Sequence, residues 1–123
     1  MFDSDVDNWN QYTSNFDKKI KKKQNLIFLI ETDEDIKFGV FISSKIDTIN
    51  DYISDENAFI FTFKDNNPMK FDIKKDRKDK AFSLFNKSYD YLFQIGNYDI
   101  YIFKQYYQSS IFQNKNITIS NYK

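Results

Sequence analysis

The sequence predicts an α+β, β-rich fold: a two-sheet antiparallel β-sandwich with an N-terminal helix and short flanking helices. Three observations predict it. Aromatic residues make up 20% of the 123 residues, mostly as Phe and Tyr, and a disordered chain would be depleted in them. One segment near the N-terminus has apolar residues at helical spacing. About seven or eight later segments have the alternating or short apolar patterns of β-strands.

The length of the chain corresponds to one domain. A chain of 123 residues and 14.9 kDa is long enough for a single core that buries roughly two-thirds of the unfolded surface. No repeat, linker or low-complexity block divides it. We therefore expect one domain over residues 1–123, with a helix at 4–22, a sandwich core at 26–103 and a polar tail at 104–123.

Helical spacing defines the first element, residues 4–22. Asp3, Ser4 or Asp5 can cap its start, and the acidic residues there suit the positive end of the helix dipole. The lysines at its other end suit the negative end of the same dipole. The apolar stripe, at steps of three and four, consists of Val6, Trp9, Thr13, Phe16 and Ile20.

Strand signals follow the helix. The apolar run at 26–31 indicates a strand that is buried on both faces or central in its sheet. An acidic loop at 32–35 leads into a strand at 36–42, so the two strands are expected to form a hairpin. Gly39 lies inside the second strand, where glycine usually marks a bulge or a close approach to the backbone. The mixed pattern at 43–56 suits a short helix or an irregular excursion.

Five further strand signals begin after residue 57. In the first, Phe59, Phe61 and Phe63 alternate on one face, which predicts that they are core residues. A turn at 65–68 leads to the second, and Gly96-Asn97 predicts a tight two-residue hairpin between the last two. The lysine-rich segment 75–80 is expected to be a solvated loop. The five strands are expected at 58–64, 69–74, 82–85, 91–95 and 98–103, and a weak strand signal lies at 117–120.

Charge and residue usage argue against several classes of function. The 18 basic and 18 acidic residues cancel, whereas a duplex nucleic-acid binder usually has a basic excess, so we expect no nucleic-acid partner. The chain has no cysteine and no histidine, which removes disulfides, thiolate metal sites, cysteine catalysis and the commonest general base. We therefore predict no enzymatic activity, no cofactor and no bound metal. An enzyme that uses two carboxylates alone is the alternative within this class.

Two acidic stretches superficially resemble cation sites. They are Asp3, Asp5 and Asp7, and the loop formed by Glu31, Asp33, Glu34 and Asp35. An EF-hand loop counted from Asp3 would need a glycine and a glutamate where the chain has Asn8 and Ser14, so helix capping is the better interpretation. A solvated hairpin turn is the better interpretation of the second stretch.

The lysine run from Lys18 to Lys23 has two interpretations. Anionic lipid attracts such a cluster by about 1 kcal/mol per charge, but a solvated helix end is the better interpretation. Peripheral binding to a membrane or phosphoinositide surface through Lys18 to Lys23 is the alternative function, and weak contact with a membrane surface agrees with it. The N-terminus MFDSDVDNWN has no apolar region of a signal peptide, and the run at 26–30 is too short to span a bilayer. We expect a cytoplasmic protein with no transmembrane segment.

Four stretches of the chain carry a family resemblance. They are the helix with Asp3-Ser4-Asp5, Trp9, Phe16 and Ile20 followed by Leu26-Ile27-Phe28-Leu29-Ile30; KFGVFI at 37–42; DENAFIFTF at 55–63; and IGNYDIYI at 95–102. In this order they resemble the TLDc domain, the module of the oxidation-resistance protein family, and they cover most of residues 1–110. The sequence resembles the divergent, Asn- and Lys-rich TLDc domains of amoebae.

The sequence departs from the family pattern in two places. The family's poly-glycine stretch is reduced to Gly96, and no closing strand is evident after Ser110, so a shortened C-terminus with an unpaired sheet edge and a tendency to self-association is expected. The resemblance implies a two-sheet sandwich that binds protein partners and has no established enzymatic chemistry. It also implies a link to protection against oxidative stress and to subunits of the vacuolar-type proton-pumping ATPase.

Overall fold

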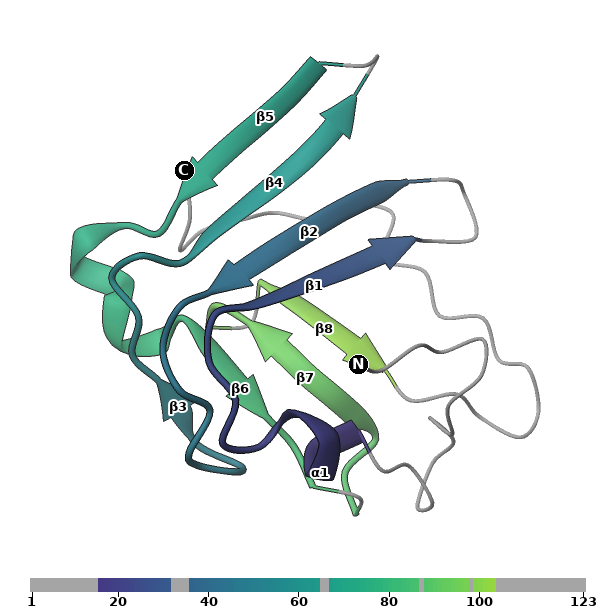
Figure 1. Ribbon diagram of the computed structural model, residues 1–123, viewed down its shortest axis with the longest axis vertical. Helices are drawn as coiled ribbons and strands as arrows, with labels where there is room; N and C mark the ends of the chain where they lie inside the picture. The colour runs from purple at the N-terminus through teal and green to yellow at the C-terminus, as the bar shows by residue number, and fades with distance from the viewer. Residues whose placement is uncertain (1–15, 32–35, 65–66, 87, 98, 104–123) are drawn as a thin grey trace.

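Two antiparallel sheets make up most of the fold in the computed structural model, which describes residues 16–31, 36–64, 67–86, 88–97 and 99–103 (Figure 1). The first sheet has the order β1-β2-β4-β5 and the second has the order β3-β6-β7-β8. The predicted two-sheet antiparallel sandwich is therefore confirmed. The first sheet contains β1 (Leu26–Glu31), β2 (Lys37–Ile42), β4 (Phe59–Lys64) and β5 (Asn67–Asp72). The second contains β3 (Tyr52–Ile53), β6 (Phe82–Leu84), β7 (Tyr91–Ile95) and β8 (Ile100–Phe103).

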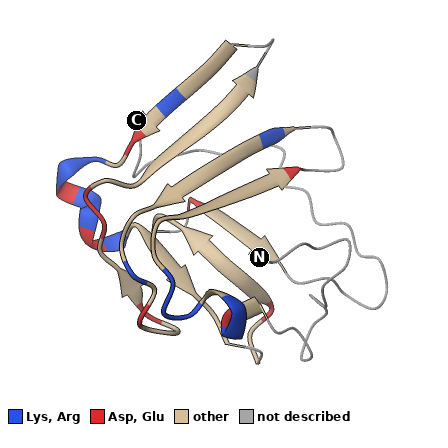
Figure 2. Ribbon diagram, in the orientation of Figure 1, with Lys and Arg blue, Asp and Glu red and all other residues tan. Residues whose placement is uncertain are grey.

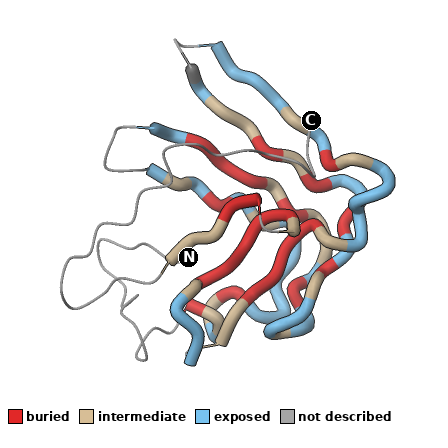
Figure 3. Tube along the Cα trace, turned by 180° about the vertical axis from the view of Figure 1, so that it is seen from behind, coloured by how far each residue is buried: buried red, intermediate tan, exposed pale blue. Residues whose placement is uncertain are grey.

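Phenylalanine rings from both sheets and from the helix α1 (Phe16–Ile20) meet in the core. Phe28 of β1 stacks on Phe82 of β6, with 5.1 Å between ring centroids, and lies 4.9 Å from Phe93 of β7. Phe16 of α1 stacks on the same Phe93 at 5.4 Å. Aromatic pairs at such distances add about 0.5–1.5 kcal/mol each beyond their buried area. These four rings therefore join the helix to both sheets. Figure 3 shows that strands of both sheets contain buried residues.

The helix α1 lies within the predicted helix 4–22, whose first part falls outside the described residues. It ends at Ile20, two residues earlier than predicted. The reason is that Lys22 adopts a left-handed backbone with φ 69°, and its N–H donates to the carbonyl of Ile46 at 2.5 Å. This bond directs the chain away from the helix axis and into β1.

The strand β1 has the predicted bounds and pairs with β2 as predicted, but its predicted place in the sheet is wrong. Among the strands that the structure describes it lies at an edge, and Ile27 and Leu29 are 61% and 75% exposed. Leu26, Phe28 and Ile30 face the core instead. A continuous apolar run is compatible with a strand buried on both faces and also with a strand that has an exposed apolar face, so the run alone does not distinguish them.

The segment between β2 and β4 is largely irregular, as one of the two alternatives for 43–56 predicted. Its contribution to the second sheet is the two-residue strand β3. Ile46 and Ile53 are buried in the core, which holds the excursion against the sandwich. The predicted solvated loop at 75–80 is an exposed 3-10 helix, η1 (Lys75–Lys80).

Two connections between strands differ from the predicted turns. The strand β5 begins at Asn67, so Pro68 is not in the turn but in an edge strand, opposite Phe63. Proline has no N–H to donate, and an edge strand tolerates it where the nitrogen points away from the neighbouring strand. Ile95 pairs with Ile100, so residues 96–99 connect β7 and β8, two more than predicted. Gly96 has φ 69°, a conformation that glycine adopts without the strain other residues would have.

Candidate functional site

The first sheet has an apolar outer side, which we call the aromatic face. Its side chains alternate with those that enter the core, and they come from three neighbouring strands. In one cross-strand row Ile27 pairs with Phe41, and Phe41 pairs with Phe59. In the next row Leu29 pairs with Gly39, and Gly39 pairs with Phe61. The aromatic face consists of Ile27, Leu29, Phe41, Phe59, Phe61 and Phe63.

The rings of the aromatic face contact one another in a continuous chain. Phe41 and Phe59 have centroids 5.2 Å apart, Phe59 and Phe61 are 6.1 Å apart, and Phe61 and Phe63 meet edge-on at 5.7 Å. Phe63 is 56% exposed. A contiguous patch of exposed and half-buried apolar side chains marks an interaction site more often than isolated apolar residues do.

Charged residues border the aromatic face. On β5, Lys70 lies 4.5 Å from the centre of the Phe59 ring and 3.2 Å from a carboxylate oxygen of Asp72. Where β1 ends and β2 begins, Nζ of Lys37 lies 4.0 Å from Oε1 of Glu31. Figure 2 shows that the strands between these borders carry little charge. An apolar centre with a polar rim is the usual arrangement of a protein-binding surface.

Gly39 allows the aromatic face to pack closely. A Cβ atom at this position would lie 2.2 Å from Cζ of Phe61, far inside a normal contact. The strand is paired without a register shift on both sides of Gly39, so of the two predicted roles the close approach is confirmed and the bulge is not. The ring of Phe61 therefore lies over the glycine and occupies the space of the missing side chain in the cross-strand row of Leu29, Gly39, Phe61 and Lys70.

The prediction that Phe59, Phe61 and Phe63 are core residues is wrong. The inward positions of β4 are occupied by smaller residues, and Ile60 is only 1% exposed. The signal that would have corrected the prediction is the register of the hairpin. Phe61 pairs with Lys70 and Phe59 pairs with Asp72, and directly opposite residues share a face, so the rings share the face of two charged residues.

The second sheet has a different outer side. Ser83 and Gln94 pair directly, alternate with core residues and are both buried. The Nε2 group of Gln94 donates to Oγ of Ser83 at 3.3 Å. The two sheets therefore differ: the outer side of the first is apolar and exposed, whereas these positions of the second are polar and buried.

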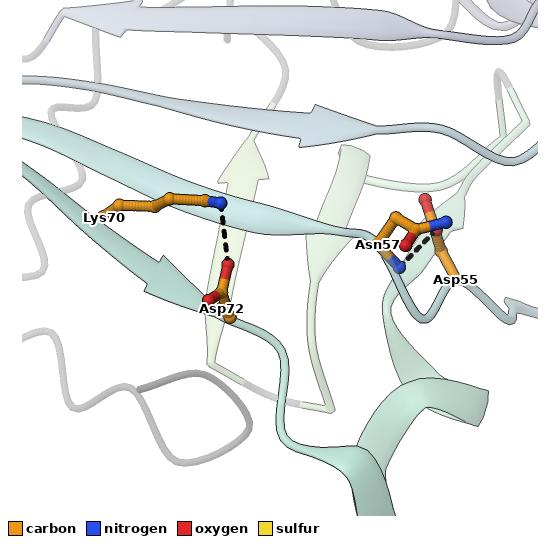
Figure 4. A network of polar contacts seen from close by, with 4 residues as sticks. All are labelled: Asp55, Asn57, Lys70 and Asp72. Carbon is orange, nitrogen blue, oxygen red and sulfur yellow. Dashed lines mark hydrogen bonds and ion pairs between the residues drawn. The ribbon is translucent and has the colours of Figure 1, made fainter.

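A buried carboxylate, Asp55, organises the loops at one end of the sandwich (Figure 4). It is 3% exposed. One oxygen accepts from the N–H of Ser43 at 2.5 Å and that of Ser44 at 3.1 Å. The other accepts from Oγ of Ser43 at 2.6 Å and from the N–H of Asn57 at 3.0 Å. Four donors satisfy this carboxylate within the protein, so its role is structural.

The structure describes only some of the charged residues that the sequence offered as candidate sites. Asp3, Asp5 and Asp7 lie outside the described residues, as do Asp33, Glu34 and Asp35, while Glu31 faces Lys37. Of the lysine run, Lys18, Lys21, Lys22 and Lys23 are exposed at the end of α1 and the turn after it. Within the described ranges no three acidic residues gather closely enough to hold a metal ion.

The helices of the described chain are short. None of them has the length and hydrophobicity needed to cross a membrane. The aromatic face presents apolar area, ring edges and paired charges at its border.

Comparison with known proteins is consistent with this fold. No curated protein and no solved structure matches the chain significantly. The family model of the TLDc domain matches residues 1–122, nearly the whole sequence. The chain therefore belongs to the TLDc domain family.

Proposed function

We propose that this chain is a non-enzymatic protein-interaction module that binds its partner through the aromatic face. The observation that supports the proposal is the continuous row of exposed and half-exposed rings across β2 and β4, bordered by charged pairs. Aromatic residues supply large contact area with few rotatable bonds, and they are enriched at the centres of protein interfaces. The absence of histidine and cysteine from the sequence is in keeping with a binding role.

Membership of the TLDc family supports a more specific partner. The proposed partner is a subunit of the vacuolar-type proton-pumping ATPase, and the proposed cellular context is the response to oxidative stress. With no cysteine and two methionines, the chain has little capacity to scavenge oxidants directly, so protection would act through the bound partner.

The test is capture of purified subunits of this ATPase by the immobilised chain. Phe63→Ser removes an exposed ring of the aromatic face, and we expect it to weaken capture more than about tenfold, as loss of an interface hot spot does. Met69→Ser is the matched control, because Met69 is 50% exposed and lies on the other side of the same sheet. Equal capture by the wild type and by Phe63→Ser would exclude the aromatic face as the binding surface.

A second candidate function is contact with an anionic membrane surface. The observation in its favour is the exposure of Lys18, Lys21, Lys22 and Lys23 at one end of the sandwich. Sedimentation with phosphatidylcholine vesicles, with and without a phosphoinositide, tests it. This function requires binding to the phosphoinositide vesicles that is lost when the lysines of the run are replaced by glutamine. The Phe63→Ser variant should bind such vesicles normally.

A further inference from the structure

The outer edge of β1 lacks the features that protect sheet edges. Among the described strands β1 has one neighbour, β2, and its other edge faces no described strand. From Leu26 to Ile30 it has no charged residue and no proline. The opposite edge strand, β5, contains both Pro68 and Lys70, which are residues that discourage pairing between sheet edges. Among the described strands, one edge of this sheet is therefore protected and the other is open to pairing.

The charges at the two ends of β1 favour one kind of partner. Lys21, Lys22 and Lys23 are exposed just before the strand. Glu31 ends it. A second copy of the same strand, laid antiparallel, places its acidic end beside this basic end and its basic end beside this acidic end. A parallel copy would place like charges together, which is unfavourable.

The alternation of side chains along β1 limits the register of such a pair. Directly opposite residues must share a face, so the core side of one copy must continue the core side of the other. A register with Phe28 opposite Phe28 of the second copy satisfies this condition. It places Ile27 opposite Leu29 of the second copy, and so covers part of the two most exposed apolar side chains of the strand.

We propose that two copies of this chain pair through the edges of β1, antiparallel and about a two-fold axis. Four strands from each copy then form one continuous sheet, and the two aromatic faces become one surface. This inference goes beyond the proposed function, because the dimer uses the backbone edge of β1, whereas partner binding is tested at Phe63 on β4. A dimer of this kind would present two copies of the binding surface on the same side.

The mass of the full chain in solution tests the proposal. Sedimentation equilibrium of the 123-residue chain should give twice the 14.9 kDa of one copy at micromolar concentration. Leu29→Lys should give a single copy, because a lysine on each of the paired strands adds repulsion and removes apolar contact. Leu29 is 75% exposed, so the variant should keep its fold, which its circular dichroism will show. Phe63→Lys is the control and should remain a dimer, since Phe63 is not on β1.

The absence of cysteine from the chain permits a sharper test of the register. Oxidation of an equal mixture of Ile27→Cys and Leu29→Cys chains should form a disulfide between unlike chains, because these positions are directly opposite. Each variant alone should crosslink at least about tenfold less, because diagonal positions are too far apart for a disulfide. A monomeric mass for the wild type, or equal crosslinking in all three samples, would overturn the proposal.

The charges provide an independent measurement. Replacing Lys21 and Lys23 by glutamate places like charges together at both ends of the pair, and we expect the dissociation constant of the dimer to rise at least about tenfold. Added salt should weaken the wild-type dimer by screening the same pairs. A dissociation constant unaffected by both changes would contradict antiparallel pairing. Loss of partner capture in Phe63→Ser with an intact dimer would separate this inference from the proposed function.

Discussion

At Gly39 a single hydrogen in place of a side chain decides how β2 and β4 pack on the aromatic face. We predict that Gly39→Ala lowers the free energy of unfolding by about 1–3 kcal/mol, because the new Cβ displaces the Phe61 ring. In a Phe61→Leu background the same change should have a much smaller effect, since the shorter side chain leaves room for the methyl group. Urea denaturation of the four chains gives the coupling energy. An equal loss in both backgrounds would mean that Phe61 does not cover Gly39.

The carboxylate of Asp55 is the second residue whose chemistry is specific to its site. Asp55→Asn replaces one accepting oxygen by a donating amide group that then faces N–H or O–H donors from Ser43, Ser44 or Asn57. We expect a loss of about 2–3 kcal/mol of stability in urea denaturation. Asp72→Asn is the control, because its carboxylate is 69% exposed and pairs only at the surface with Lys70. That change should alter stability by less than about 1 kcal/mol.

At the scale of an element, β4 has one face in the core and one face on the outside. Ile60→Ala should cost about 2–5 kcal/mol by leaving a cavity between the sheets, since Ile60 is almost fully buried. The adjacent outward change, Phe63→Ser, should cost less than about 1 kcal/mol despite the greater loss of volume. Thermal or chemical denaturation of the two variants checks the order. If Phe63→Ser were the more damaging, the assignment of the two faces would be reversed.

The β4–β5 hairpin shows how far sequence patterns reach at this scale. The predicted bounds of the main strands are close to the observed ones, because alternation and turn residues act locally. The orientation of β4 was predicted wrongly, because the alternation of its phenylalanines shows that they share a face but not which face. Any hairpin loop with an even number of residues pairs Phe61 with an even-numbered residue of β5, which is Pro68, Lys70 or Asp72, and two of these three are charged. The parity of the loop therefore contained information on the outward face that alternation alone does not give.

At the scale of the whole molecule, four rings connect α1 to both sheets. Phe93 is their common member, because it contacts Phe16, Phe28 and Phe82. We predict that Phe93→Ala lowers stability by about 3–5 kcal/mol and that the sheets still unfold in one transition. Circular dichroism in the near and far ultraviolet should give coincident unfolding curves. Phe93→Leu, a milder change, supplies the same comparison if the alanine variant is too unstable. A stability unchanged by either substitution would contradict the place of Phe93 at the centre of this cluster.

The sequence by itself determined that this chain forms short antiparallel strands with a helix before them, because side-chain alternation, apolar spacing and turn residues are local properties. It also limited the chemistry, since a chain without cysteine and histidine lacks the side chains of many catalytic and metal sites. Only the tertiary structure decided that β1 is an edge strand and that Phe59, Phe61 and Phe63 face outward. The physical reason is that a strand has two faces and two edges, and which of them is buried depends on residues far away in the sequence, such as Phe82 and Phe93 of the opposite sheet.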